Sequence, residues 1–188
     1  MTTTKTKKTT ESPIESLPSN PFVFEILDLA SKQRTNAKKV EVLKTYEHDS
    51  LKAIFIWNFD DSVISLLPEG EVPYGNVDEQ SVYSGTLSQN LSREASGGES
   101  ATGQDLDGRG KTSLRREYAN LYHYVKGGND SMTTIRREMM FINLLQGLHP
   151  KEAEVLILVK DGRLSDKYKI SHDVVKEAYP DVQWGGRS

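Results

Sequence analysis

The sequence predicts a mainly α protein, in which a helical N-terminal segment and a C-terminal helical bundle are joined by an acidic connector rich in Gly and Ser. Apolar side chains recur at intervals of three and four residues in both halves, as on the buried face of a helix. Glycines or an Asp-Gly pair follow these runs in the C-terminal half and are typical helix stops. Residues 112–124 and 133–145 also read almost as copies, because each carries an Arg-Arg-Glu step that leads into apolar residues.

Three helices are expected in the N-terminal half. Asn20 is a favoured N-cap and Pro21 is tolerated at a first helical position, so the first helix is expected to begin there. The second helix is expected over residues 36–47, and Ser50 is expected to cap the third. Residues 53–59 are β-branched and aromatic and could instead form a strand. We expect a helix there, because no second strand signal lies nearby to pair with it.

The distribution of charge divides the chain into parts. Residues 60–108 hold ten acidic side chains and one basic side chain, whereas the segments on either side are mildly basic. Together with the Gly and Ser content, this predicts an acidic connector over residues 68–110, between a helical segment at 20–67 and a helical unit at 111–188. An ordinary acidic surface loop is the alternative. Residues 1–19 hold too few apolar side chains to offset the entropy of ordering, so we expect a flexible tail.

Four helices are expected in the C-terminal unit, and each is followed by a stop signal. Their expected ranges are 112–126, 131–146, 150–160 and 171–179. Tyr118 and Tyr122, both in the first of these helices, have the i, i+4 spacing of a pair that faces a core.

A group of basic side chains lies at or near the expected helix starts, where backbone amides and the helix dipole also favour anions. The group consists of Arg109, Lys111, Arg115, Arg116, Arg136 and Arg137. Paired helices could gather these charges into a phosphate-binding patch, and the nearby tyrosines supply the aromatic side chains common in nucleic-acid contacts. A solvated helix entrance is the alternative, because Glu117 and Glu138 dilute the patch and the isoelectric point is about 5.8.

The sequence contains no pattern of residues that indicates catalysis or a bound metal. Cysteine is absent, the four histidines are scattered, and no Gly-x-Ser-x-Gly elbow is present. The stretch from Gly103 to Thr112 resembles a phosphate-binding loop, but Asp105 stands where the first glycine of that motif belongs. We therefore expect a protein that is not an enzyme and that holds neither a cofactor nor a metal.

The chain lacks the features of a membrane or secreted protein. No apolar run approaches the roughly 20 residues of a membrane-spanning helix, and the mean hydropathy is −0.58. The basic N-terminus has no apolar stretch of the kind that a secretory signal needs. These observations predict an intracellular protein that does not bind a membrane.

Three segments of the chain, residues 114–130, 141–154 and 178–188, resemble an uncharacterised protein family, a domain of unknown function, of T4-like phages, chiefly those that infect cyanobacteria. The resemblance covers residues 20–188. It implies a viral protein made in the cytoplasm of a bacterial host. It implies no activity, so it assigns no functional residue.

We therefore expect a non-enzymatic, phage-encoded helical interaction protein that acts through a phage or host protein during infection. An acidic, Gly-rich connector suits such a role, because it can become ordered on a partner or let two units move independently. Two alternatives stay open. One is a nucleic-acid-binding accessory factor of phage replication or transcription, with DNA or RNA as its partner. The other is a component of the virion or of head assembly.

Overall fold

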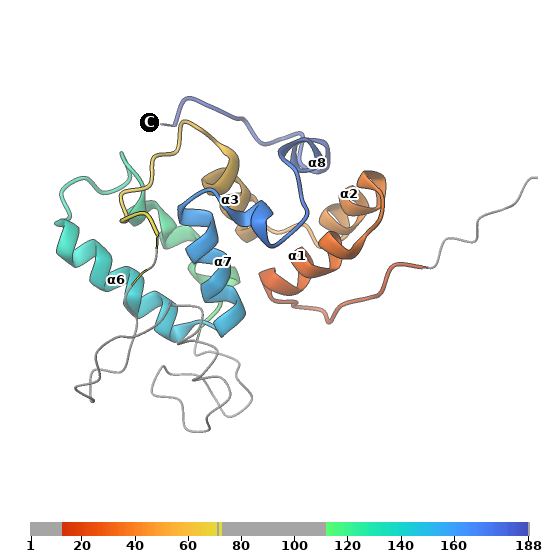
Figure 1. Ribbon diagram of the computed structural model, residues 1–188, viewed down its shortest axis with the longest axis horizontal. Helices are drawn as coiled ribbons and strands as arrows, with labels where there is room; N and C mark the ends of the chain where they lie inside the picture. Colours follow the sequence, from red (N-terminus) through yellow and green to blue (C-terminus); the bar gives the residue numbers. More distant parts are fainter. Residues whose placement is uncertain (1–12, 71, 73–111, 188) are drawn as a thin grey trace, which may run out of the picture.

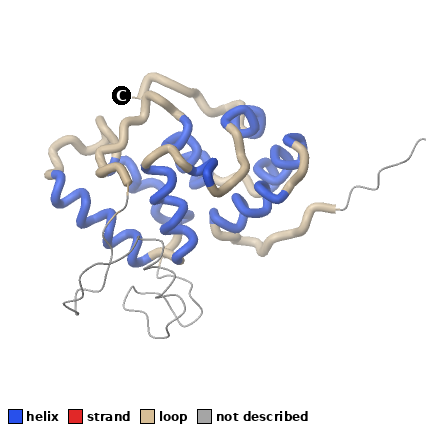
Figure 2. The backbone as a smooth tube through the Cα atoms, in the orientation of Figure 1, coloured by secondary structure: helices blue, strands red, loops and turns tan. Residues whose placement is uncertain are grey.

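The structure is a computed structural model that describes residues 13–70, 72 and 112–187. The regular structure of these residues is helical (Figures 1 and 2), which confirms the predicted mainly α class. In chain order the α-helices and 3-10 helices are α1 (Val23–Lys32), α2 (Asn36–Thr45), α3 (Asp49–Phe59), α5 (Leu114–Glu117), η1 (Tyr118–Tyr124), α6 (Thr134–Gly147), α7 (Pro150–Lys160), η2 (Leu164–Asp166) and α8 (His172–Ala178). Most of the predicted tail and connector lies outside the described residues, together with Arg109 and Lys111.

The N-terminal and C-terminal helices pack against each other and share one hydrophobic core. α3 and α7 lie side by side at the centre, with α1 and α2 on one side and α6 on the other (Figure 1). α8 closes the core against α2. Phe55, Phe141 and Tyr179 are the largest aromatic side chains that are fully buried, and they come from both halves of the chain. The helices predicted at 20–67 and 111–188 therefore bury their apolar faces jointly.

Two of the predicted helix starts in the N-terminal half are wrong, and the helix predicted from residue 131 begins at Thr134, after the Thr133 cap. α1 begins at Val23 rather than at Pro21, and its N-cap is Phe22, whose amide donates to the Glu25 carboxylate at 3.1 Å. α3 begins at Asp49, because the Nδ1 atom of His48 accepts from the amide of Ser50 at 3.1 Å. Ser50 is thus a buried helical residue and not a cap. Residues 53–59 lie in α3, which confirms the helix prediction for that stretch over the strand alternative.

The helix predicted at 112–126 is instead one α-turn, α5, followed by the 3-10 helix η1. In a 3-10 helix, residues three apart lie on one line. Leu121 and Tyr124 are therefore both buried and Tyr118 is partly buried, whereas Tyr122 is 48% exposed. The prediction of a Tyr118 and Tyr122 core pair is wrong for Tyr122. The similar sequence at 133–145 forms a regular α-helix, so the two near-copies differ in structure.

Glu152 joins the two halves of the chain through a buried carboxylate. It lies in the first turn of α7 and is fully buried. Its Oε2 atom accepts from the amide of Val23 and its Oε1 atom from the amide of Leu114, both at 3.1 Å. These amides open α1 and α5 and carry the partial positive charge of helix N-termini. Burial raises the pKa of the Glu152 carboxyl to about 7, although the two amide hydrogen bonds act to lower it.

A second buried charge, Lys160 at the end of α7, fixes the chain that leaves α3. Its ammonium donates to the carbonyl oxygens of Pro68 at 2.9 Å and Gly70 at 2.7 Å. It also pairs with the Asp161 carboxylate at 2.8 Å. Each donor of the buried ammonium thus has an acceptor, as a buried cation requires.

Replacing Glu152 by Gln is expected to destabilise the protein, because the NH2 group of Gln takes the place of one accepting oxygen and faces a backbone N–H donor. An unsatisfied buried donor costs about 1–3 kcal/mol. The folded protein holds the Glu152 proton more tightly than the unfolded chain, so the wild type is expected to lose stability as the pH rises from 4.5 towards 7. This loss amounts to about 3 kcal/mol at most. Urea unfolding followed by circular dichroism at pH 5 and pH 8 measures it.

Glu154→Gln is the matched control for this experiment. Glu154 lies on the same helix, but its carboxylate binds Lys167 near the surface, at 2.6 Å. This variant is expected to keep the pH dependence of the wild type. An unchanged pH dependence in Glu152→Gln would contradict the role of the buried carboxylate.

Candidate functional site

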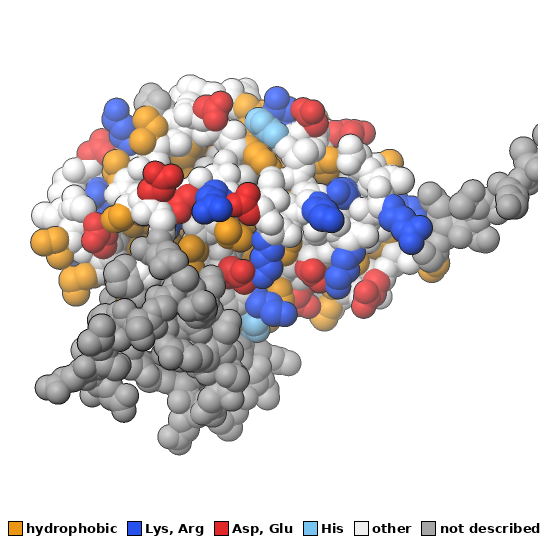
Figure 3. Space-filling model, viewed as in Figure 1, with side chains coloured by type: hydrophobic (Ala, Val, Ile, Leu, Met, Phe, Trp, Pro, Cys, Tyr) orange, Lys and Arg blue, Asp and Glu red, His pale blue; other side chains and the backbone are white. Residues whose placement is uncertain are grey.

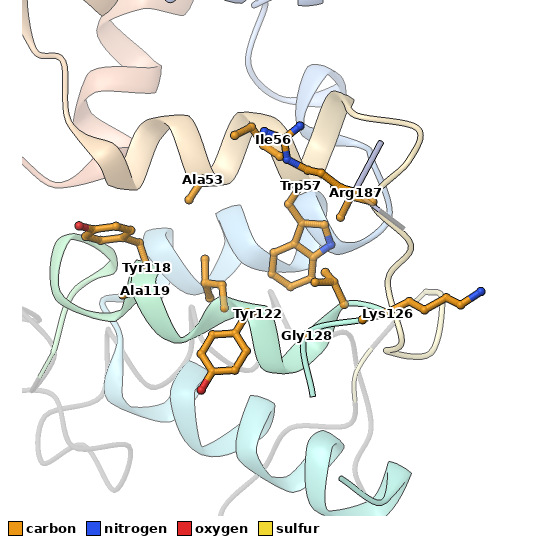
Figure 4. A pocket seen from close by; sticks show the side chains of 13 residues that line it. Ala53, Ile56, Trp57, Tyr118, Ala119, Tyr122, Lys126, Gly128 and Arg187 are labelled. Carbon is orange, nitrogen blue, oxygen red and sulfur yellow. The ribbon is translucent and has the colours of Figure 1, made fainter. Parts of the chain in front are cut away.

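A groove of about 400 Å³ lies on the described surface between α3 and η1. Figure 4 shows Trp57 at its centre, Tyr118 at one end and Lys126 at the other. The lining is aromatic and aliphatic along most of its length, and the residues that form it are Ala53, Ile56, Trp57, Val63, Tyr118, Ala119, Leu121, Tyr122, Val125, Lys126, Gly127, Gly128 and Arg187. A hollow of this volume lies within the usual range for ligand sites.

The aromatic floor of the groove is fixed by stacking. The Trp57 ring lies parallel to the ring of Tyr124, with centroids 6.2 Å apart and an angle of 7°. Tyr124 in turn meets Phe141 of α6 edge to face, at 5.2 Å. Tyr122 is half-exposed, and Figure 4 shows it on the η1 side. Stacking therefore holds the Trp57 ring in place, whereas the Tyr122 ring lies against His123, with centroids 4.0 Å apart, and about half of Tyr122 is exposed.

The end of the groove next to Lys126 is closed by a short antiparallel bridge between the chain after α3 and the chain after η1. The amide of Leu66 donates to the Tyr124 carbonyl at 2.8 Å, and that of Lys126 donates to the Ile64 carbonyl at 2.9 Å. Gly127 follows with φ +86°, in the left-handed region that favours glycine. The bridge fixes the backbone from which the Lys126 side chain extends.

Gly128→Ala is expected to disturb this end of the groove, because its added Cβ would lie 1.9 Å from the Tyr122 carbonyl oxygen. Overpacking of this kind costs about 1–3 kcal/mol. Gly147→Ala is the control, since its Cβ would meet only the Thr112 methyl at 3.4 Å and alanine favours the helix. Thermal unfolding should show a lower Tm for Gly128→Ala alone. Equal melting of the two variants would contradict the close approach.

The C-terminal tail forms part of the groove through Arg187. The nearly buried carboxylate of Asp60 accepts from the Gly185 amide and from the Arg187 guanidinium, both at 2.9 Å. It also accepts from the amide and hydroxyl of Ser62. Burial acts to raise the pKa of the Asp60 carboxyl, but these hydrogen bonds and the Arg187 charge outweigh it and lower the pKa.

Asp60→Ala is expected to release the tail. The amide of Gly185 loses its acceptor, and the guanidinium of Arg187 loses its counter-charge. Hydrogen exchange by NMR should show faster exchange of the Gly185 amide in the variant than in the wild type. Asp61→Ala, at an exposed neighbouring position, should leave this exchange unchanged. Slow exchange in both variants would show that other contacts hold the tail.

A second apolar surface lies on α6, away from the groove lining. Ile135 is 73% exposed and Met139 is 59% exposed, and their i, i+4 spacing puts them on one face of the helix. Apolar side chains stand out at the end of the molecule where α6 begins (Figure 3). This pair is a natural comparison for variants of the groove.

The structure does not gather the four described arginines of the predicted basic group into one patch. Arg137 is buried, and its guanidinium donates to the carbonyl oxygens of His123, Asn129 and Met132. Its role is therefore to fix the turn between η1 and α6.

The other arginines lie at opposite ends of α6. The amide of Thr112, next to α5, donates to the carbonyl of Gly147 at the C-terminal end of α6, so Arg115 and Arg116 lie near that end. Arg136 lies at the N-terminal end, about 16 Å away along a helix that rises 1.5 Å per residue. On the face shown in Figure 3, basic and acidic side chains alternate and no large basic area forms.

His48 and His172 make contacts that hold the fold together. His48 caps α3, and the His172 ring stacks on Phe59 at 5.2 Å and meets Trp184 edge to face at 4.3 Å. Burial lowers the pKa of both imidazoles. The described ranges contain no group of three His, Asp or Glu side chains placed to hold a metal ion. Within the same ranges, no helix has the length and apolar character to cross a membrane.

The sequence predicts only part of this site. It places Tyr118 and Tyr122 beside the basic group, but no pattern in it connects Trp57, Lys126 and Arg187 with them. These residues come from distant parts of the chain and meet only in the fold. The signal that could have pointed to the groove is the aromatic run before Gly127.

Fold and site together define a mainly helical protein, whose described residues share one core and form an aromatic surface groove. The chain belongs to a family of unknown function, DUF6433, whose model matches residues 26–97 and 100–166. This confirms the resemblance to an uncharacterised family. No curated protein and no solved structure matches the chain.

Proposed function

We propose that the chain is a non-enzymatic, phage-encoded helical protein that acts by binding a protein partner, from the phage or its host, through the groove between α3 and η1. The observation that carries this proposal is the lining of the groove. Trp, Tyr and Arg are the residue types most enriched at the energetic centre of protein interfaces. The groove presents Trp57, Tyr122 and Arg187 together.

The chemistry of the groove supports binding over catalysis. Its described lining residues include no His, Asp, Glu, Ser or Cys, and its Tyr and Lys side chains have no acid–base partner beside them in that lining. The buried Glu152, whose pKa is raised, faces two backbone amides and not the groove. The perturbed carboxyl therefore has a structural explanation.

The phage origin and a place in the host bacterial cytoplasm belong to the proposal as well. They rest on the resemblance of residues 114–130, 141–154 and 178–188 to proteins of T4-like phages. A protein made in an infected cell can meet partners from the phage and from the host.

A charged side chain introduced into the groove is expected to weaken binding of the partner. Ala119 lines the groove and is exposed, so Ala119→Arg introduces a long cation without opening the core. A tagged wild-type copy is expected to co-purify with the partner from infected cells. The amount of partner that co-purifies with the variant is expected to be lower by a factor of about ten or more. Mass spectrometry with labelled standards measures the ratio.

Ile135→Arg is the matched control, because it adds the same charge at an exposed apolar position outside the groove. It is expected to recover the partner as the wild type does. Equal recovery with Ala119→Arg, or a loss confined to Ile135→Arg, would contradict binding through the groove.

A nucleic-acid-binding accessory factor of phage replication or transcription is the second candidate. Arg115 and Arg116 support it, since they are adjacent on α5 and Arg116 is exposed. Heparin retention that falls in Arg115→Ala/Arg116→Ala would favour this role, and contacts to phosphates should weaken with added salt. A role in the virion or in head assembly would require the protein in purified particles, which mass spectrometry detects.

A further inference from the structure

We infer that the groove between α3 and η1 recognises a partner segment in which an apolar side chain stands next to a carboxylate. This rests on the proposed function, because it names the chemistry that the protein partner presents to the same groove. The apolar side chain lies on the Trp57 floor, and the carboxylate meets the Lys126 ammonium.

The floor of the groove favours an apolar side chain of the partner. The Trp57 ring is held parallel to Tyr124, and only 7% of the Trp57 residue is exposed. A fixed apolar floor loses little conformational entropy when a side chain covers it.

The charges around the groove favour a carboxylate on the partner. Lys126 and Arg187 are the charged residues of the lining, and both are cations. The charge of Arg187 is balanced by Asp60, whose carboxylate lies 2.9 Å from the guanidinium and is itself 2% exposed. Lys126 is exposed, and no carboxylate of the described residues pairs with its ammonium. The charge that the groove offers to a partner is therefore that of Lys126.

The position of Lys126 decides where the carboxylate lies relative to the apolar side chain. Figure 4 shows Lys126 at the end of the groove opposite Tyr118, with Trp57 between them. The Lys126 backbone is held by its hydrogen bond to Ile64 at 2.9 Å. A carboxylate on the residue next to the inserted side chain reaches this ammonium, and a charge-assisted hydrogen bond forms. A basic partner residue at that place would meet a like charge.

Two capped dipeptides test the inference, because they differ only in the acidic group. Acetyl-Phe-Glu-amide and acetyl-Phe-Gln-amide are titrated into the ¹⁵N-labelled full chain up to roughly 10 mM, and the Trp57 indole N–H signal is followed by NMR. The chain has two tryptophans, so the Trp184→Phe variant assigns the signal. The Glu peptide is expected to bind about three- to tenfold more tightly than the Gln peptide.

The Lys126→Gln variant is expected to bind the two peptides equally, through a loss of affinity for the Glu peptide alone. Lys176→Gln, which removes an exposed cation on α8 outside the groove, is the control and should keep the preference. Added salt should reduce the preference for the Glu peptide, because a surface ion pair is screened.

The outcomes separate this inference from the proposed function. If both peptides shift the Trp57 signal with equal affinity, the inference is overturned and the groove still binds apolar side chains. If neither peptide shifts the signal, both are overturned. A preference that survives in Lys126→Gln also overturns the inference, because the carboxylate would then be recognised elsewhere.

Discussion

The contact on which the rest of the structure depends is the buried carboxylate of Glu152 between the helix starts of α1 and α5. It joins residues 129 positions apart in the chain, Val23 and Glu152, through one hydrogen bond, and α5 through the other. Two N–H groups that no intrahelical bond can satisfy thereby find an acceptor in the core. Since η1 continues directly from α5, this contact also sets where η1 lies against α3.

The groove is a consequence of that placement and of the local geometry of η1. A 3-10 helix aligns Leu121 and Tyr124 on its inner face and leaves Tyr122 facing outward. The bridge to the chain after α3 then closes the end at Lys126. The groove is thus lined mainly by aromatic and aliphatic side chains and has the exposed Lys126 at one end.

Several elements could be predicted from the sequence because short-range signals determine them. α7 matches its predicted range of 150–160, and its stop at Gly162 has φ +69°, as a glycine C-terminal stop predicts. The start of α1 could not be predicted, because a contact to Glu152 outweighs the local preference of Asn20 for the cap. Tyr122 was misplaced for a similar reason: the i, i+4 rule assumes an α-helix, and the residues around it form a 3-10 helix.

The sequence by itself determined the helical class, most of the helix ends and the membership of a family of unknown function, because apolar spacing, glycines and proline act over a few residues. The tertiary structure alone decided that Arg137 is buried among three carbonyl oxygens rather than exposed in a basic patch. It also decided that Trp57, Lys126 and Arg187 share one groove. Such groupings depend on which helices pack together, and that packing is set by buried contacts between residues far apart in the chain.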